Sequence, residues 1–545
     1  MTSSVSGDSL PDDPQRRRLL QAAGAGLALA GMSPLAFAAG DATSVARTRS
    51  GRVRGVREQG VHVFKGIRYG ADTAATRFQP PRPPQPWSGV AAALAYGASA
   101  PQRGDGGPGS EDCLFLNVWT PALADGGKRP VLFYIHGGGY DTGSGSDALY
   151  DGTRLCRRGD VVVVTVNHRL NAFGYLHLGQ IGGPELAASG NAGQLDLVLA
   201  LQWVRDNIAG FGGDPGNVTV FGQSGGGAKI ATLMAMPTAR GLFHRAWTMS
   251  GQQVTAAGPR AATQRAQLFL RTLDIDPAAP DAIARLRALP VATLLEATTV
   301  RDFSRVEDTR LYFGPVMDGQ VLPRHPFWPD APAQSTAIPM VIGNTRDETR
   351  AFLGNDPQNF NLTWETLPAR LEKQQFVDIR VDLVVAEYRR LYPQYTPSEV
   401  FFAATTAGRS WRGAVEELEV RARQSAPEAP TWAYQLDWGS PLDGGKFRAF
   451  HTLDIPLVFD NIGQPGSRTG DGADAQAMAD RMSDALLSLA RHGDPNHGGL
   501  ARWEPYSMAR RQTMLFDVPP TLADDPRGAE RRFWQQAPFV QRGTM

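Results

Sequence analysis

One short stretch constrains the fold more than any other, the run VTVFGQSGGG at residues 218–227. β-favouring residues lead into Gly222-Gln-Ser-Gly-Gly226, and an Ala-, Leu- and Met-containing segment follows from 228 to 236. This order predicts a strand, a tight turn with Ser224 at its tip, and then a helix, which is the arrangement called a nucleophile elbow. Glycines are needed there because larger side chains two residues either side of the serine would collide with the strand and the helix. The helix would aim free N–H groups and a positive dipole end at negative charge formed beside Ser224.

The composition is typical of a soluble globular protein, and the chain is long enough to form a large core. It has 545 residues, of which 42% are hydrophobic and 20% charged. The formal charge is +1, with acids and bases mixed along the chain, so we expect no nucleic-acid partner. Cys113 and Cys156 lie near apolar, strand-like sequence and outside any cluster with metal-ligand spacing. We therefore expect buried free thiols rather than a bridge between them, and neither a metal nor a cofactor.

The first 38 residues predict an export signal. Arg16-Arg17-Arg18 precede a weakly apolar stretch rich in Ala and Gly, which ends in the small-x-small site Ala36-Phe-Ala38. Paired arginines before such a stretch resemble a bacterial twin-arginine signal, and the alternatives are an ordinary Sec signal or a short membrane anchor. Pro34 and the glycines argue against a stable transmembrane helix, and no later segment is long enough for one. We expect a periplasmic or secreted protein that starts near Ala39.

Strand and helix patterns alternate along the rest of the chain. The runs 131–135 and 161–166 are continuously apolar, and residues 194–208 carry apolar side chains at helical spacing. Such strands, interleaved with helices, predict an α/β fold with a large, mostly parallel sheet and helices on both faces. Later strands are predicted at 338–343, 431–436 and 512–516.

The same alternation predicts a single domain over residues 39–545. Helical sequence at about 255–335 and 352–426 predicts insertions above the sheet, where they would form the walls of a gorge. Two stretches within them, 301–313 and 401–412, mix arginines with aromatic residues. They could shape a substrate pocket, but we favour the interpretation that these aromatic side chains pack the insertions.

A serine hydroxyl needs a base within hydrogen-bond reach, and the base needs an acid that orients it. In an elbow enzyme the acid and then the histidine follow the serine along the chain. His451 lies in a loop between a predicted strand and apolar sequence, which makes it the best candidate for the base. We expect His244 to pack in the core or on the surface, and His325 lies in a proline-rich loop. His492 and His497 flank a turn and are expected to be exposed loop residues.

The acid should follow a buried strand. Asp347 and Glu348 both follow the predicted strand at 338–343, and spacing alone does not choose between them. A separate run, His136-Gly-Gly-Gly139, comes directly after the first buried strand. Consecutive glycines let backbone N–H groups approach a substrate oxygen, so this run is a candidate oxyanion hole. A glycine loop of this kind upstream of G-x-S-x-G is typical of lipases and esterases.

From about Gly51 to its C-terminus the chain resembles the type-B carboxylesterase family of the α/β-hydrolase superfamily. The motifs that carry the resemblance occur in the family's order, and they are FKGIRYG (64–70), EDCLFLNV (111–118), YIHGGGY (134–140), VTVNHRL (164–170), FGGDP (211–215), the elbow, TRDE (345–348) and FH…DIPLVF (450–459). The resemblance implies a nucleophile, an acid and a base at Ser224, Glu348 and His451. It implies an oxyanion hole at Gly138, Gly139 and Gly225.

Glu348 is chosen over Asp347 because the acid of this family is the glutamate of a D-E-G motif. Here Thr349 replaces the glycine of that motif, which puts the local turn in question. Gly225 replaces the family's usual alanine, which we expect to matter little because the donor is backbone. His168 stands where a tyrosine is usual.

The resemblance also bears on the scaffold. It implies two structural ion pairs, Arg77 with Glu111 and Arg169 with Asp196. The family's first disulfide joins the cysteine of its E-D-C-L motif to one in a preceding loop, and here that loop has no cysteine. Cys113 is therefore expected to be free, which fits export of an already folded protein.

These observations predict a serine hydrolase of carboxylic esters that works through an acyl-enzyme and takes a small-molecule ester. One alternative is the same three residues specialised for a particular natural-product ester, amide or lactone. Another is a non-catalytic binding or adhesion member of the fold. The sequence leaves the substrate and the oligomeric state open.

Overall fold

A computed structural model describes residues 44–104, 109–302, 310–375, 377–424, 426 and 429–541. The export signal predicted for residues 1–38 lies outside the described residues, as does the middle of the stretch 301–313. None of the helices within the described ranges combines the length and apolarity needed to cross a membrane.

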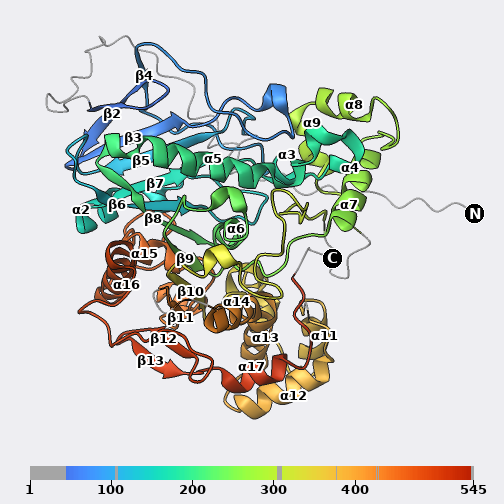
Figure 1. Cartoon of the computed structure of the whole chain (residues 1–545). Helices are drawn as coiled ribbons and strands as arrows, with labels where there is room; N and C mark the ends of the chain where they lie inside the picture. The colour runs from blue at the N-terminus through green and yellow to red at the C-terminus, as the bar shows by residue number, and fades with distance from the viewer. Residues whose placement is uncertain are drawn as a thin grey trace, which may run out of the picture. The chain divides into compact units, whose positions relative to one another are not determined.

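A 13-stranded sheet organises the described chain, and its colour in Figure 1 runs from blue strands at one edge to red strands at the other. The order across the sheet is β1-β2-β3-β5-β7-β6-β8-β9-β10-β11-β12-β13, with β4 paired to β2. The strands are β1 Ser44–Arg47, β2 Arg52–Glu58, β3 Val61–Arg68, β4 Val90–Ala92, β5 Phe115–Thr120, β6 Arg129–Ile135, β7 Val162–Val166, β8 Gly213–Gln223, β9 Arg245–Met249, β10 Met340–Thr345, β11 Thr431–Leu436, β12 Gln512–Phe516 and β13 Thr521–Asp524.

The middle of this sheet is parallel, from β7 across to β12, and antiparallel pairs close both edges. The register brings the carboxyl ends of the central strands level. Ile135 of β6 lies opposite Gly222 of β8, and Gln223 lies opposite Met249 of β9. Met249 in turn lies opposite Gly343 of β10. Loops that leave these strands therefore meet at one edge, which is where ligands bind in sheets of this kind.

Both faces of the sheet are buried, which explains the continuous apolar runs. Val131, Phe133 and Ile135 of β6 point into one core, and Leu132 and Tyr134 point into the other. The first core is shared with α5, α6 and α14, and the second with α2, α15 and α16. The mostly parallel α/β architecture predicted from the sequence is confirmed. Strand β9 was not predicted from the sequence, because it is only five residues long and carries no motif.

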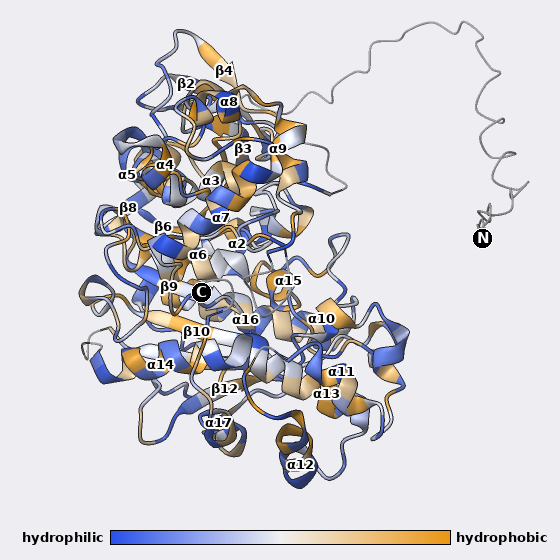
Figure 2. Cartoon of the chain, turned by 90° about the vertical axis from the view of Figure 1, so that its right-hand side faces the viewer, coloured by the Kyte–Doolittle hydropathy of each residue, from blue (hydrophilic) through white to orange (hydrophobic). Residues whose placement is uncertain are grey.

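Helices connect the strands and fill the two inserted stretches. Helix α12, for instance, buries Val384 and Tyr388 and exposes Arg389 and Arg390, and hydrophobic and hydrophilic residues alternate along its ribbon (Figure 2). The helices are α2 Thr153–Gly159, α3 Asn171–Tyr175, α4 Gly179–Gly182, α5 Ala192–Asn207, α6 Gly225–Leu233, α7 Pro259–Thr272, α8 Ala282–Ala288, α9 Val291–Ala297, α10 Arg350–Leu353, α11 Leu367–Glu372, α12 Val381–Leu391, α13 Pro397–Thr406, α14 Arg412–Gln424, α15 Asp454–Val458, α16 Ala473–His492 and α17 Gly528–Trp534.

The first inserted stretch is less helical than its sequence suggests. Helices α7 to α9 occupy residues 259–297, whereas the described residues from 310 to 332 form no helix. Five prolines between 315 and 332 explain the difference, because each removes a backbone donor and clashes with the preceding turn of a helix.

The expected ion pairs are present and buried. Arg169 binds Asp196 through two side-chain hydrogen bonds of 2.7 and 2.9 Å, and the Arg77 Nε donates to Glu111 at 2.7 Å. Cys113 and Cys156 are buried free thiols, as predicted.

Candidate active site

The backbone of Ser224 is strained, as the sharp turn between β8 and α6 requires. Its φ and ψ are 55° and −125°, values that residues with a side chain rarely adopt. The turn is held by a hydrogen bond of 2.7 Å from the Ser224 N–H to the carbonyl of Met249 in β9. The flanking glycines fit because a Cβ at residue 226 would lie 2.0 Å from the carbonyl oxygen of Ile135. The elbow predicted from the sequence is therefore confirmed in its geometry.

The histidine and the glutamate meet in the interior. The Nδ1–H of His451 donates to Oε2 of Glu348, and both side chains are almost fully buried. The other carboxylate oxygen of Glu348 accepts hydrogen bonds of 3.1 Å from Asn344 Nδ2 and from the Thr345 N–H. Burial alone would raise the pKa of Glu348, but the charge and hydrogen bond of His451 outweigh it, with the Ser250 and Asn344 side chains adding to them. The pKa is therefore lowered and Glu348 is ionised near neutral pH.

Asp347 points elsewhere. Its carboxylate pairs with Arg350 at 3.2 Å, and its N–H donates to the carbonyl of Ala449. The turn that was in question at Thr349 is ordinary, because φ there is −75° and needs no glycine. The Thr349 hydroxyl lies 3.0 Å from the carbonyl of Phe402, so it ties the acidic turn to α13.

Ser224 and His451 line one cavity but are not hydrogen-bonded to each other in the described structure. The Nε2 of His451 instead lies 3.2 Å from the side-chain amide of Gln223, the residue before the serine. The His451 ring also packs against Phe352 of α10, with ring centroids 4.7 Å apart. A bond that tightens only when substrate binds is common in sites of this type, so this spacing leaves His451 available as a base.

The glycine loop after β6 approaches the elbow closely. Gly138 and Gly139 have φ values of 79° and 61°, which favour glycine. Within the described residues, the N–H groups of Gly138, Gly139 and Gly225 donate to no other group. A Cβ at residue 225 would lie 2.1 Å from the Gly139 carbonyl oxygen. Gly225 in place of alanine therefore matters more than expected from the sequence, because it makes room for this loop.

These groups face a cavity of 490 Å³. Ser224, His451, Gly139 and Gly225 line it, whereas Gly138 does not. Among the histidines of the described residues, His451 alone contributes to the lining. The remaining lining residues are Tyr140, Asp141, Ala228, Ser250, Gly251, Gln252, Gln253, Leu311, Tyr312, Phe313, Phe352, Arg409, Ser410 and Gln541.

The aromatic residues of the insertions divide between two roles. Phe401 and Phe402 pack in the core of the second insertion, as we favoured from the sequence. Tyr312 and Phe313 instead line the cavity, so for them the pocket interpretation is the correct one. Arg409 and Ser410 reach the cavity from a π-helical turn, Ala407–Trp411, between α13 and α14. Such turns occur often at functional sites.

Most other histidines pack locally, as predicted. His244 and His325 each accept a backbone N–H at 3.1 Å, from Val218 and Ala256. His497 differs from the prediction, because it is partly buried and donates to the carbonyl of Arg481. No group of three or more His, Cys, Asp or Glu side chains in the described ranges is arranged to hold a metal ion.

Three residues of this region were not singled out from the sequence. Ser250 follows β9 at the same edge of the sheet, Gln223 contacts His451, and Lys229 lies under the glycine loop. Gln223 could have been found because it precedes Ser224 in the elbow, whereas Lys229 could not, because its contacts lie far away in the sequence. Ser250 could not, because β9 itself was missed.

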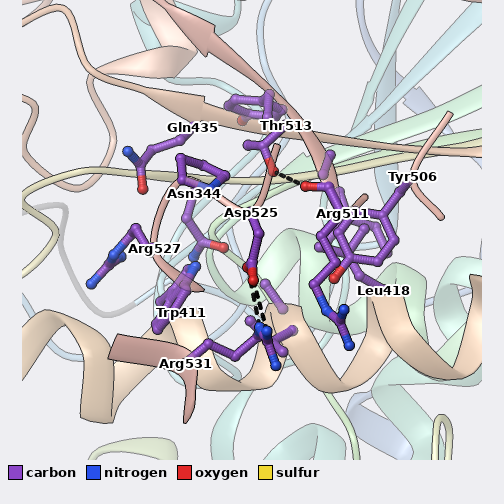
Figure 3. Close-up of a pocket in the computed structure, with 16 residues that line it drawn as sticks. Asn344, Trp411, Leu418, Gln435, Tyr506, Arg511, Thr513, Asp525, Arg527 and Arg531 are labelled. Atoms are coloured by element: carbon purple, nitrogen blue, oxygen red, sulfur yellow. Dashed lines mark hydrogen bonds and ion pairs between the residues drawn. The ribbon is translucent and has the colours of Figure 1, made fainter. Parts of the chain in front are cut away.

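A smaller cavity of about 40 Å³ lies where α14 and α17 meet the sheet, lined in part by Trp411, Arg527 and Arg531 (Figure 3). Ser224, Glu348 and His451 do not line it. Its one link to the site is Asn344, which lines this cavity and donates to Glu348. The candidate active site is therefore the cavity that Ser224 and His451 line.

Comparisons with known proteins agree with this geometry. The sequence pattern of the carboxylesterase family matches residues 42–534. The chain is 35% identical to the para-nitrobenzyl esterase of Bacillus subtilis, over 90% of this chain and 98% of that protein. It is 33% identical to the fumonisin B1 esterase of Sphingopyxis macrogoltabida, over 89% and 88% of the two chains. The crystal structure of a carboxylesterase from Geobacillus stearothermophilus is similar, with a TM-score of 0.78, 38% identity, and coverage of 90% of this chain and all of that one. Because the matches span nine-tenths of the chain, this protein belongs to the carboxylesterase family of α/β-hydrolase enzymes.

Proposed function

We propose that this protein hydrolyses carboxylic esters through an acyl-enzyme on Ser224. His451 serves as the base and Glu348 as the acid that orients it. The observation that carries the proposal is the hydrogen bond from His451 to the buried Glu348 carboxylate, beside a strained Ser224 in the same cavity.

The Nε2 of His451 removes the proton from the Ser224 hydroxyl as its oxygen attacks the ester carbonyl. Glu348 stabilises the imidazolium that forms and keeps its Nδ1–H aimed at the carboxylate. The negative charge on the carbonyl oxygen is bound by the N–H groups of Gly138, Gly139 and Gly225. His451 then gives its proton to the leaving alcohol, and water releases the acid by the same steps.

The cavity favours esters with an apolar or aromatic group. Leu311, Tyr312, Phe313 and Phe352 supply apolar surface beside Ser224. Relatives whose names specify quite different esters share this chain's family, so a specialised natural-product ester, amide or lactone remains the alternative substrate class. A screen of p-nitrophenyl esters of increasing acyl length, with aromatic esters beside them, separates a general esterase from a specialised one.

Labelling by a fluorophosphonate probe tests the proposal directly. We expect the folded protein to be labelled once per chain, at Ser224, and to lose esterase activity in proportion. A folded protein that is not labelled would support the non-catalytic alternative. Labelling at another serine would identify that residue, and not Ser224, as the nucleophile.

We further propose that residues 1–38 direct export to the periplasm, or out of the cell, through the twin-arginine route. The support is the arginine cluster and the Ala36-Phe-Ala38 site. Replacing Arg16, Arg17 and Arg18 with lysine should retain the protein in the cytoplasm. A Sec signal would tolerate that change, so normal export would contradict this part of the proposal.

A further inference from the structure

Lys229 occupies an unusual place directly behind the glycine loop. It lies on α6, the helix that begins after Ser224, and its side chain is fully buried. Its ammonium donates to the carbonyl of Gly139 at 2.7 Å and to the carbonyl of His136 at 3.3 Å. It also lies 5.4 Å from the centre of the Tyr140 ring. All of its polar contacts are therefore with the segment that follows β6.

The surroundings of Lys229 disfavour the protonated, charged form of its side chain. It makes no ion pair with an acidic side chain in the described part of the chain. Burial lowers its pKa to about 7. The rings of His136 and His168 stack 4.7 Å apart and are held neutral, because burial, and then the charge of Lys229, lower the pKa of both. A buried lysine without a carboxylate partner is costly, and a leucine or methionine would suit a purely structural position better.

The two carbonyls that accept hydrogen bonds from Lys229 flank the peptide group that joins Gly138 to Gly139. Residue 136 precedes Gly138 and Gly139, and the second acceptor belongs to Gly139 itself. Between them the Gly138 carbonyl accepts hydrogen bonds of 3.2 and 3.0 Å from the N–H groups of Asp141 and Thr142. A peptide group is planar and trans, so that carbonyl fixes the opposite direction of the Gly139 N–H. Lys229 and this turn thus set where the glycine N–H groups point.

Gly225 belongs to the same arrangement. A Cβ at this residue would lie 2.1 Å from the oxygen that Lys229 binds, so the Gly139 carbonyl can approach α6 only because residue 225 has no side chain. The lysine draws the loop toward the helix, and the glycine allows it to come close. Both features bring the N–H groups of the loop and of the first turn of α6 together.

We propose that Lys229 is a positioning residue for the oxyanion hole, holding the Gly138 and Gly139 N–H groups toward the carbonyl oxygen that Ser224 attacks. This inference rests on the proposed ester hydrolysis. In its protonated form, Lys229 also favours the negative oxygen of the tetrahedral intermediate over the neutral carbonyl of the substrate. The interaction is therefore worth more in the transition state than in the bound substrate, which lowers kcat and not KM when it is lost.

The test is Lys229→Met, measured with a short p-nitrophenyl ester and with a trifluoromethyl ketone that forms an oxyanion on Ser224. We expect kcat to fall about 10- to 100-fold, less than the loss of a direct oxyanion donor. KM should change less than about threefold, and the affinity for the ketone should fall by the same factor as kcat. Lys229→Gln, an uncharged donor one atom shorter, should recover part of the loss.

Arg421→Met is the matched control. Arg421 is also fully buried, and two of its donors bind backbone carbonyls, those of Ser335 and Ile338, but it does not line the cavity. Its loss should lower the melting temperature and leave kcat within about twofold. If Lys229→Met keeps wild-type kcat, or if kcat falls while the ketone binds unchanged, the proposal is wrong. It is also wrong if both variants lose kcat in proportion to their melting temperatures.

The same measurements distinguish failure of the Lys229 proposal from failure of the proposed ester hydrolysis. Wild-type protein that neither cleaves esters nor reacts with a fluorophosphonate would overturn the proposed function. Wild-type protein that does both, with an unaffected Lys229→Met variant, would overturn only the role of Lys229. If the methionine variant does not fold, Lys229→Gln and Gly225→Ala take its place. The alanine should displace Gly139 and lower kcat and ketone affinity together, and unchanged values for both would contradict the proposal.

Discussion

The cavity has two parts that are built differently. Its floor consists of the glycine loop after β6, Ser224 and His451, with Glu348 behind His451, and these residues follow strands of the sheet. Its wall consists of residues 311–313, Phe352 and the turn with Arg409 and Ser410, all from the inserted stretches. The floor is tied together by backbone and buried side-chain hydrogen bonds. Leu311 and Phe313 of the wall are held by side-chain packing in a cluster that the first insertion shares with residues such as Phe78 and Phe173.

This difference assigns catalysis to the floor and the selection of substrate to the wall. Floor groups are fixed through the register of β6, β8, β9 and β10, so a small shift in any one strand would misalign all of them. Wall groups can change without disturbing that register. Loops positioned by a rigid scaffold commonly carry variable function, and here the wall can vary while the floor stays fixed. We therefore expect floor substitutions to abolish turnover and wall substitutions to alter which ester is used.

Ser224→Ala is expected to have the largest effect. Removing the nucleophile should lower kcat by about 10⁴-fold or more, because the remaining groups bind the ester but form no acyl-enzyme. The fold should persist, since a Cβ is already present at this strained residue. Esterase assays at high enzyme concentration measure the fall in kcat, and a thermal melt measures whether the fold persists. Undiminished activity in a folded variant would remove Ser224 from the mechanism.

Glu348→Gln compared with Asp347→Asn sharpens the assignment within the floor. The glutamine removes the charge that stabilises the His451 imidazolium, so kcat should fall on the order of 10³- to 10⁴-fold. Asp347→Asn should change kcat less than about threefold, because that carboxylate pairs with Arg350 instead. Both are isosteric amides, so each controls for the other in the same assay. The opposite pattern would transfer the role of the acid to Asp347.

The floor was largely predictable from the sequence and the wall was not. Gly225 and Gly226 are required by contacts of 2.0 to 2.1 Å, and Gly138 and Gly139 after β6 by their positive φ. Requirements of this kind leave a pattern of glycines in the sequence. The choice between Asp347 and Glu348 needed the family resemblance, because two adjacent carboxylates satisfy the same spacing. Tyr312 and Phe313 looked like packing residues, since an aromatic side chain has the same signature in a core and in a cavity wall. Lys229 was missed because its role depends on a carbonyl 90 residues away.

Phe313→Ala should change selectivity more than chemistry. Enlarging the wall should shift the ratio of kcat/KM between a bulky and a short acyl ester by about 10-fold, in favour of the bulky one. Turnover of the short ester should stay within about threefold, since the floor is intact. Leu286→Ala is the control, because Leu286 is buried in the same cluster as Phe313 but does not line the cavity. An equal shift in the control would mean that loosening of the insertion, and not the wall itself, sets selectivity.

The smallest expected effect is a pH dependence of stability that arises at Asp454, on which the charges of Glu348 and His451 act. Asp454 is fully buried at the start of α15, with Tyr434 donating to it at 2.9 Å. Burial, and then the charge of Glu348, raise the pKa of Asp454 to about 7. Because the folded protein holds this proton more tightly than the unfolded chain, stability falls as pH rises from about 4 to about 7.

Asp454→Asn removes this titration while keeping an oxygen for the Tyr434 hydroxyl. Thermal melts at pH 5 and pH 8 should show the variant gaining about 3 °C relative to the wild type at the higher pH, and no advantage at the lower one. Asp382→Asn, an exposed carboxylate on α12 of the second insertion, should leave the difference between the two pH values unchanged. If the exposed variant shifts as much as Asp454→Asn, the pH dependence is a property of net charge and does not distinguish the floor from the insertions. If neither variant changes the difference in melting temperature between the two pH values, Asp454 is ionised in the folded protein. Two buried carboxylates, Glu348 and Asp454, would then lie within the field of His451.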